Sequence, residues 1–237
     1  MTGLARRPSR LMTLVSLCFV VTGLIAPVSA QAPPSAAEIA GYVGLHGSAA
    51  SGSAQSITEM LAKGLDPDAR DGNGRTPFHV AAFLKRHAAM RALAGGKANV
   101  NALDQQRYDA VTIAAVADDP ETMSLAIRLG NSAANVTSVY DGTALIAAAH
   151  LGHDEVVRRL VAAGAPLDQV NNLGWTALIE AVILGNGGAR HQACVAALLA
   201  GGANPNIADR SGLTPLVLAK RRGYAEMVRL IELAGGT

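Results

Sequence analysis

The sequence predicts an all-α solenoid, in which short helix–turn–helix units stack side by side and are joined by β-hairpin-like loops. Composition is the first observation: 50% of the 237 residues are hydrophobic, but only 3% are aromatic. Strands favour aromatic and β-branched residues, whereas Ala and Leu favour helices. The second observation is a repeat typical of stacked proteins. Similar segments recur with spacings of 33, 34, 33 and 38 residues, at Thr76, Asp109, Thr143, Thr176 and Thr214.

Residues 1–30 have the pattern of a secretory signal peptide. A basic leader precedes an apolar stretch and a run of small residues that offers a cleavage site: Arg6, Arg7 and Arg10, then Leu11–Ala26, then Val28–Ala30. We expect the mature chain to begin at Gln31, with a flexible lead-in over residues 31–37. The apolar stretch is shorter than the roughly 20 residues that span a bilayer. An uncleaved anchor and a twin-arginine signal are the alternatives.

Charge and cysteine content agree with export. The formal net charge is +2, and removing the three leader arginines from 20 basic residues leaves 17 against 18 acidic residues, or −1. A near-neutral chain without a Lys/Arg cluster is not expected to bind nucleic acid. Cys18 would leave with the leader, so Cys194 has no partner for an internal disulfide. We expect a periplasmic protein, or a secreted one as the alternative, with no membrane attachment after cleavage.

The repeat divides residues 38–237 into six units, at about 38–70, 71–103, 104–137, 138–170, 171–208 and 209–237. In each unit, the Thr of the recurring segment can cap the first helix by accepting from backbone N–H groups. Pro77 and Pro215 follow this Thr and suit the first helical position. Ala pairs keep the first helix thin enough for close stacking.

The second helix of a unit shows one apolar face. In Asp154–Ala162, four apolar residues recur at helical spacing and Gly164 then ends the helix: Val156, Val157, Leu160 and Val161. Segments rich in Asn, Asp and Gly make outward turns between units. A single unit cannot bury its apolar face, so neighbours must stack. Burying one Leu contributes roughly 1.5–3 kcal/mol.

Two units are expected to depart from this pattern. The unit 171–208 carries about five extra residues, because its repeat spacing is 38 instead of 33. We place this insertion between its two helices, as a loop at Gly187–His191. The last helix, Tyr224–Ala234, is rich in charged residues, which fits a polar cap over the end of the stack.

These segments resemble the ankyrin repeat. The Thr-Pro-Leu-His-x-Ala pattern of that family is matched by Thr76-Pro-Phe-His79-Val-Ala, and its inter-helix turn by Gly152-His153. The resemblance covers about 200 residues, from 38 to 237. It implies an ankyrin repeat protein, whose partners dock on the hairpin tips and on the concave face of the first helices. Together with the leader pattern and the Ala-, Arg- and Gly-rich composition, it indicates an exported bacterial member of that family. The first unit lacks the Thr-Pro-Leu-His pattern, and Asp109-Ala110 replaces Thr-Pro.

No catalytic residue, metal site or cofactor is predicted. His79 occupies the His of the repeat pattern, for which the resemblance implies hydrogen bonds between units. His150 and His153 are three residues apart, but Gly152 separates them and a third ligand is missing. Cys194 and His191 are also three apart, without an orienting group or an oxyanion donor. We therefore interpret Cys194 as an inert, half-buried thiol.

The candidate partner-binding residues are those that the repeat does not need. One set consists of the residues just before the recurring Thr or Asp: Arg75, Tyr108, Gly142, Trp175 and Leu213. Tyr140, two residues before Gly142, is added to this set. Aromatic and Arg side chains dominate interface energetics. Arg190 and His191 of the insertion form a second set, because loops that break a repeat often carry function. Ordinary packing across hairpins and tolerated drift are the respective alternatives.

These observations predict a non-catalytic protein–protein interaction module of the bacterial periplasm. We expect a monomer that acts as an adaptor or protective partner of another exported protein. An immunity-type inhibitor of a toxin or enzyme is the alternative, and a hydrolase that uses Cys194 and His191 is the third hypothesis. A preformed surface would lose little ordering entropy when the partner docks.

Overall fold

The structure, a computed structural model, describes residues 32–237, and the elements of this part are helices. Its single strand-type pairing is an isolated bridge between Thr137 and Gly142. The predicted all-α class is therefore confirmed. The predicted signal peptide, its cleavage site and Gln31 lie outside the described residues.

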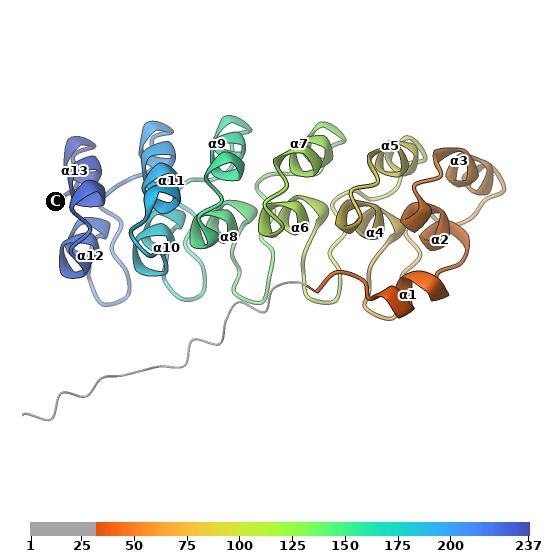
Figure 1. The fold of residues 1–237 in the computed structure, drawn as a ribbon, viewed down its shortest axis with the longest axis horizontal. Coiled ribbons are helices and arrows are strands. Elements are labelled where there is room, and N and C mark those ends of the chain that lie inside the picture. Colours follow the sequence, from red (N-terminus) through yellow and green to blue (C-terminus); the bar gives the residue numbers. More distant parts are fainter. Residues whose placement is uncertain (1–31) are drawn as a thin grey trace, which may run out of the picture. The chain divides into compact units, whose positions relative to one another are not determined.

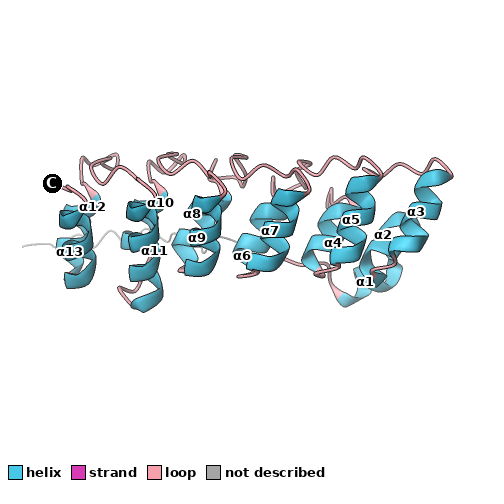
Figure 2. Cartoon of the chain, turned by 90° about the horizontal axis from the view of Figure 1, so that it is seen from above, coloured by secondary structure: helices cyan, strands magenta, loops and turns pink. Residues whose placement is uncertain are grey.

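Twelve of the thirteen helices in the described part form six consecutive pairs (Figure 1). The first helices of the pairs lie in one layer: α2 (Gly44–Ser51), α4 (Pro77–Phe83), α6 (Ala110–Val116), α8 (Ala144–Leu151), α10 (Ala177–Ile183) and α12 (Pro215–Arg222). The second helices form the other layer: α3 (Ala54–Ala62), α5 (His87–Gly95), α7 (Pro120–Arg128), α9 (Asp154–Ala162), α11 (Ala189–Ala200) and α13 (Ala225–Leu233). Each helix contacts its pair partner and the neighbours in its layer. The long loops between units follow one edge of the stack (Figure 2).

The N-terminal caps of the first helices agree with the sequence. Thr143 and Thr176 accept hydrogen bonds from the N–H groups of Ile146 and Ile179, at 3.3 and 3.2 Å. Asp109, which replaces the Thr of the pattern, accepts from the Thr112 N–H at 2.8 Å. A short side-chain oxygen therefore caps these three helices, whether it belongs to Thr or to Asp, whereas α2 follows Val43 and has no side-chain cap.

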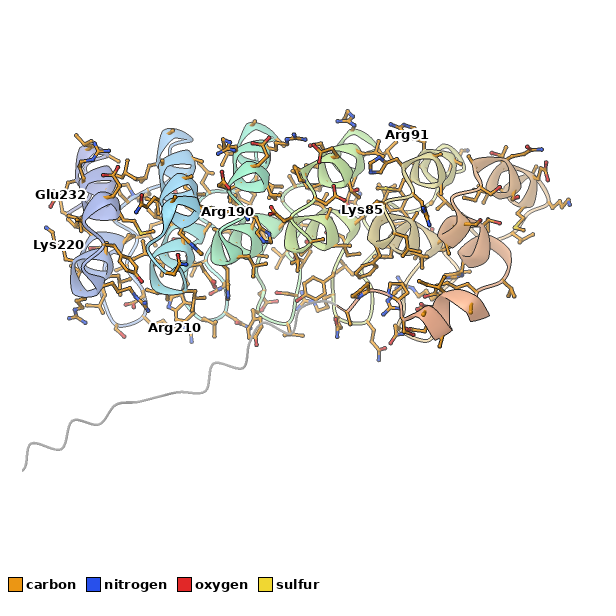
Figure 3. All side chains as sticks on the ribbon, viewed as in Figure 1. Lys85, Arg91, Arg190, Arg210, Lys220 and Glu232 are labelled. Atoms are coloured by element: carbon orange, nitrogen blue, oxygen red, sulfur yellow. The ribbon has the colours of Figure 1, made fainter. Side chains whose placement is uncertain are left out.

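The core runs between the two helix layers through all six units. In α9, which has the predicted bounds, Val156, Val157 and Leu160 are fully buried, and Val161 is half-buried. At the C-terminal end, Lys220 of α12 and Glu232 of α13 form an exposed ion pair of 2.8 Å (Figure 3). The last described unit thus turns charged side chains to solvent.

One helix lies where a flexible lead-in was expected. Helix α1 spans Ala36–Gly41. Its first two residues, Ala36 and Ala37, belong to the predicted lead-in over residues 31–37. Ser35 and Glu38 form a capping box: the Ser35 Oγ accepts from the Glu38 N–H at 3.2 Å, and the Glu38 carboxylate accepts from the Ser35 N–H at 2.7 Å. The Ser-x-x-Glu spacing was visible in the sequence and is a known helix start.

The insertion in the fifth pair is also arranged differently from the prediction. Helix α11 begins at Ala189 and has 12 residues, against nine in α9. Arg190 and His191 are therefore helical, and the loop before them covers residues 184–188. Tyr224 donates to the Gly185 carbonyl at 3.0 Å. Gly187 has a φ of +71°, and an added Cβ there would lie 2.6 Å from the Tyr224 ring, so only glycine fits this position.

His79 links the second unit to the third. Its side chain is 1% exposed. The Nδ1 atom accepts from the Thr76 N–H at 3.1 Å, so the proton resides on Nε2, which donates to the Tyr108 carbonyl at 3.1 Å. The hydrogen bond between units that the resemblance implied for His79 is present. Burial lowers the pKa of His79, which keeps the ring neutral, as this arrangement requires.

We expect the stability of the stack to fall below about pH 6.5 because of His79. The unfolded chain, with a His pKa of about 6.5, binds the proton before the folded chain does. Stability from neutral His79 is complete above that pH and is lost at up to about 1.4 kcal/mol per pH unit as the pH falls. Urea unfolding of the parent and of His79→Gln between pH 5 and 8 measures this slope. Equal slopes in the two chains would show that His79 does not contribute.

Candidate partner-binding surface

The loops between units repeat one compact turn. In four loops the N–H of the first turn residue donates to the carbonyl of the fifth at 2.9–3.0 Å: Asp71 to Arg75, Asp104 to Tyr108, Asn171 to Trp175 and Asp209 to Leu213. The side-chain oxygen of the first residue also accepts from the N–H groups of the third and fifth residues. This double closure is the Asx-turn chemistry of Asp and Asn. It holds the predicted binding positions at one place in each loop.

Hydrogen bonds also join successive loops to one another. The Gln105 N–H donates to the Asn73 carbonyl at 3.0 Å, and the Ser138 N–H donates to the Arg107 carbonyl at 2.9 Å. The Asn172 N–H donates to the Tyr140 carbonyl at 2.9 Å. The loop edge is therefore a connected surface whose backbone is already ordered, and binding to it costs little conformational entropy.

Arg75 and Tyr108, two of the predicted binding residues, are buried in the structure. They are only 6% and 5% exposed, respectively. The Arg75 guanidinium lies over the Phe83 ring at 5.6 Å and is covered by residues near the N-terminus of the described part, including Glu38. As the structure stands, neither side chain offers a free surface to a partner. For this part of the set, packing across hairpins, the alternative interpretation, agrees with the burial.

Tyr140, Trp175 and Leu213 are half-buried and reach solvent. Tyr140 and Trp175 lie on the consecutive loops of the fourth and fifth units, which the bond between Asn172 and Tyr140 joins. The structure thus brings these two aromatic residues to the same stretch of the loop edge. Leu213 occupies the equivalent turn position one unit further on.

Three exposed valines lie on the same stretch and were not among the predicted binding residues. Val139 is 63% exposed at the tip of the fourth unit's loop, and Val136 and Val170 are 39% and 43% exposed at equivalent positions before two consecutive turns. Exposed valines in segments that are otherwise polar were the available signal. We call the following set the central loop surface: Val136, Val139, Tyr140, Val170 and Trp175.

Arg190 and His191 contact the preceding units. The Arg190 guanidinium reaches Asp118 at 2.8 Å and Asp154 at 3.0 Å (Figure 3). His191 Nε2 bonds to the His150 carbonyl at 3.0 Å, and the ring packs against Gly152 and Gly185. These contacts join the fifth unit to its neighbours. The inserted residues are thus held in place, and their contact with a partner stays a prediction.

The Cys and His side chains of the chemical hypotheses have structural surroundings. Cys194 is buried, and burial raises the pKa of its thiol to about 12, the opposite of what a thiolate nucleophile requires. His150 bonds to Glu180, whereas His153 bonds to the Ala115 carbonyl. Among residues 32–237, no group of three or more His, Cys, Asp or Glu side chains is arranged to hold a metal ion. No helix in the same range has the length and hydropathy to cross a membrane.

Stacked helix pairs with a connected loop edge define the class: an α-solenoid of the repeat type. The family model described as ankyrin repeats in three copies matches residues 111–209, and the ankyrin repeat model matches residues 73–105. Ankyrin repeat protein YahD of Escherichia coli K12 is 33% identical over 185 residues, which cover 78% of this chain and 92% of YahD. The chain therefore belongs to the ankyrin repeat family.

Solved structures agree with this assignment. An ankyrin repeat domain from Acinetobacter baumannii AYE superposes with a TM-score of 0.76 and 42% identity, over 81% of this chain and 98% of that one. A second similar chain comes from the complex of a predatory endopeptidase from Bdellovibrio bacteriovorus with an immunity protein. It has a TM-score of 0.65 and 21% identity, over 81% of this chain and 98% of that one. The second likeness concerns the fold alone. Ankyrin repeats make this chain a protein–protein interaction module.

Proposed function

We propose that this protein binds another exported protein in the bacterial periplasm through its central loop surface and serves as its adaptor or protective partner. The observation that carries the proposal is the exposure of Val136, Val139 and Val170 on the two hydrogen-bonded loops that also carry Tyr140 and Trp175. Contiguous exposed apolar side chains on a soluble protein mark interaction sites. The ordered backbone of the loop edge adds to this, because a preformed surface binds at a lower entropic cost.

Substitutions in the central loop surface are expected to weaken partner capture without unfolding the protein. Val139→Asp places a charge at the centre of the surface, and Trp175→Ala removes its largest ring. Each change should weaken binding at least about tenfold, or about 1.4 kcal/mol, and Val139→Asp should leave the melting temperature unchanged within about 2 °C because Val139 is 63% exposed. Capture from periplasmic extract, followed by calorimetry with the captured protein, measures the effect.

Val43→Asp is the matched control, because Val43 is 81% exposed in the first unit, outside the central loop surface. It should bind as the parent does. If Val139→Asp and Trp175→Ala bind as tightly as Val43→Asp, the binding surface lies elsewhere on the stack.

The proposed location rests on the leader pattern of residues 1–30. Fused to alkaline phosphatase, which needs disulfides to be active, this segment should give an active enzyme, because disulfides form in the periplasm and not in the cytosol. Replacing Arg6, Arg7 and Arg10 by Gln should lower export. Activity equal to that of a leaderless fusion would contradict a periplasmic location.

An immunity-type inhibitor is the second candidate. The complex of the endopeptidase with its immunity protein, which contains a chain of similar fold, is the observation that favours it. The two functions differ in one measurable respect. Adding the purified chain would lower the activity of a captured enzyme if the chain is an inhibitor, and would leave the activity unchanged if it is an adaptor.

A further inference from the structure

Residues 32–42, here called the N-terminal strap, lie on the loop of the second unit and are joined to it by polar contacts. Arg75 makes most of these contacts. Its guanidinium donates to the Glu38 carboxylate at 3.0 Å and to the Ala32 carbonyl at 3.2 Å. Asn73 also donates to Glu38, at 2.6 Å, and Tyr42 donates to Asp71 at 2.7 Å. The strap thus occupies the side chain of Arg75, one of the residues predicted to bind a partner.

The strap contributes little to the apolar core. None of the residues of α1 is fully buried, and Ile39 and Tyr42 are half-buried against the core. Before α1, Pro34 is buried, and the chain around it is not helical. The strap is held mainly by polar contacts, most of them to Arg75, and a segment that buries little apolar surface opens locally at a lower free energy than the stack unfolds. We therefore expect the strap to open before the helix pairs of the stack do.

The strap covers a site with features of a peptide-binding site. Beneath it, the Arg75 guanidinium stacks on Phe83. Next to it lies a polar cavity of about 330 Å³, lined by Ala32 of the strap and by loop residues of the second and third units: Asn73, Arg75, Asp104, Gln105 and Gln106. This cavity is on the same loop edge as the central loop surface. A stacked Arg suits the recognition of a carboxylate.

We propose that the N-terminal strap is a detachable intramolecular ligand, which occupies the Arg75 site until a partner segment that carries a carboxylate displaces it. This inference deepens the proposed function, because the site extends the loop edge toward the N-terminus. The strap itself indicates the chemistry of the competing segment. Such a segment would offer a backbone carbonyl to one guanidinium nitrogen, as Ala32 does, and an acidic side chain to the other, as Glu38 does.

Glu38 is ionised at neutral pH, so its carboxylate can accept from Arg75 and Asn73. Hydrogen bonds from the Ser35 backbone and side chain, followed by that from Arg75, lower the pKa of Glu38 to about 2. The folded value is below that of the unfolded chain, about 4.3. The contribution of the carboxylate is therefore complete above that pH and is lost only as the pH falls toward 2.

The test uses the full chain and the variant Glu38→Lys, which places a cation beside Arg75. Hydrogen exchange of the amides of residues 38–43 should become at least about tenfold faster in the variant, with unchanged exchange in α4–α13. A fluorescent peptide of residues 32–43 should then bind the variant saturably and bind the parent at least about tenfold more weakly. The same peptide with Glu38→Gln should bind the variant more weakly than the natural peptide does.

Glu232→Gln is the matched control, because it breaks the Lys220–Glu232 ion pair at the opposite end of the stack (Figure 3). It should change neither strap exchange nor peptide binding. The proposal is overturned if Glu38→Lys leaves strap exchange at the parent rate. It is also overturned if the variant opens but fails to bind the peptide, or if its second to sixth units lose protection together with the strap. No external partner takes part, so these results are independent of the capture experiment.

Discussion

Replacing Asp109 with alanine is expected to lower the free energy of unfolding by about 2–4 kcal/mol. Asp109 is fully buried, and one carboxylate oxygen caps α6 through the Thr112 N–H at 2.8 Å. The other oxygen accepts from the side-chain amides of Asn131 and Asn135 at 2.9 and 2.8 Å. Alanine removes the cap and leaves the amide donors without this acceptor. Urea denaturation measures the loss.

Asp109→Thr separates the two contributions. Threonine restores the residue that caps the corresponding helices, but its single hydroxyl oxygen cannot replace the second carboxylate oxygen. We expect an intermediate stability, between those of the parent and of Asp109→Ala. If Asp109→Thr is as stable as the parent, the bonds to Asn131 and Asn135 contribute nothing to stability.

Leu160→Ala is the second change with a large expected effect, a loss of about 2–5 kcal/mol. Leu160 of α9 is fully buried between the helix layers, so the shorter side chain leaves a cavity that neighbouring units cannot fill. The units of a repeat stack depend mainly on their neighbours. We therefore expect protection from hydrogen exchange to fall most in the third, fourth and fifth units.

Leu233→Ala is the control for this experiment, since Leu233 is 74% exposed at the end of α13. The same chemical change should cost less than about 0.5 kcal/mol at an exposed position. Equal losses for the two variants would contradict the burial of the α9 face, and a uniform loss of protection would contradict coupling between nearest neighbours.

The regular part of the fold was predictable because its signals are local. The caps at Thr143 and Thr176 and the apolar face of Asp154–Ala162 each depend on a few residues close in sequence. Each signal is weak alone, but the same cap and the same apolar pattern recur in several units, and their agreement made the prediction of the fold specific. The last helix, predicted at Tyr224–Ala234, differs from α13 by one residue at each end.

The binding surface was less predictable, because exposure depends on contacts between distant residues. Arg75 is buried by a strap more than 30 residues earlier in the chain, which no repeat pattern describes. Arg190 reaches Asp118, 72 residues away, and so joins units that the spacing alone does not pair. The repeat pattern specifies no residue type at the position of the exposed Val139. Whether Val139 belongs to a binding surface therefore depends on which residues surround it in the fold.

The central claim is that a partner binds on the loop edge of the fourth and fifth units. Trp175 is the only tryptophan of the chain, so labelling with 5-fluorotryptophan gives one ¹⁹F resonance from this surface. Titration with the captured, unlabelled partner should shift or broaden that resonance in proportion to the bound fraction measured by calorimetry. A resonance that stays unchanged at full saturation would place the partner elsewhere and contradict the claim.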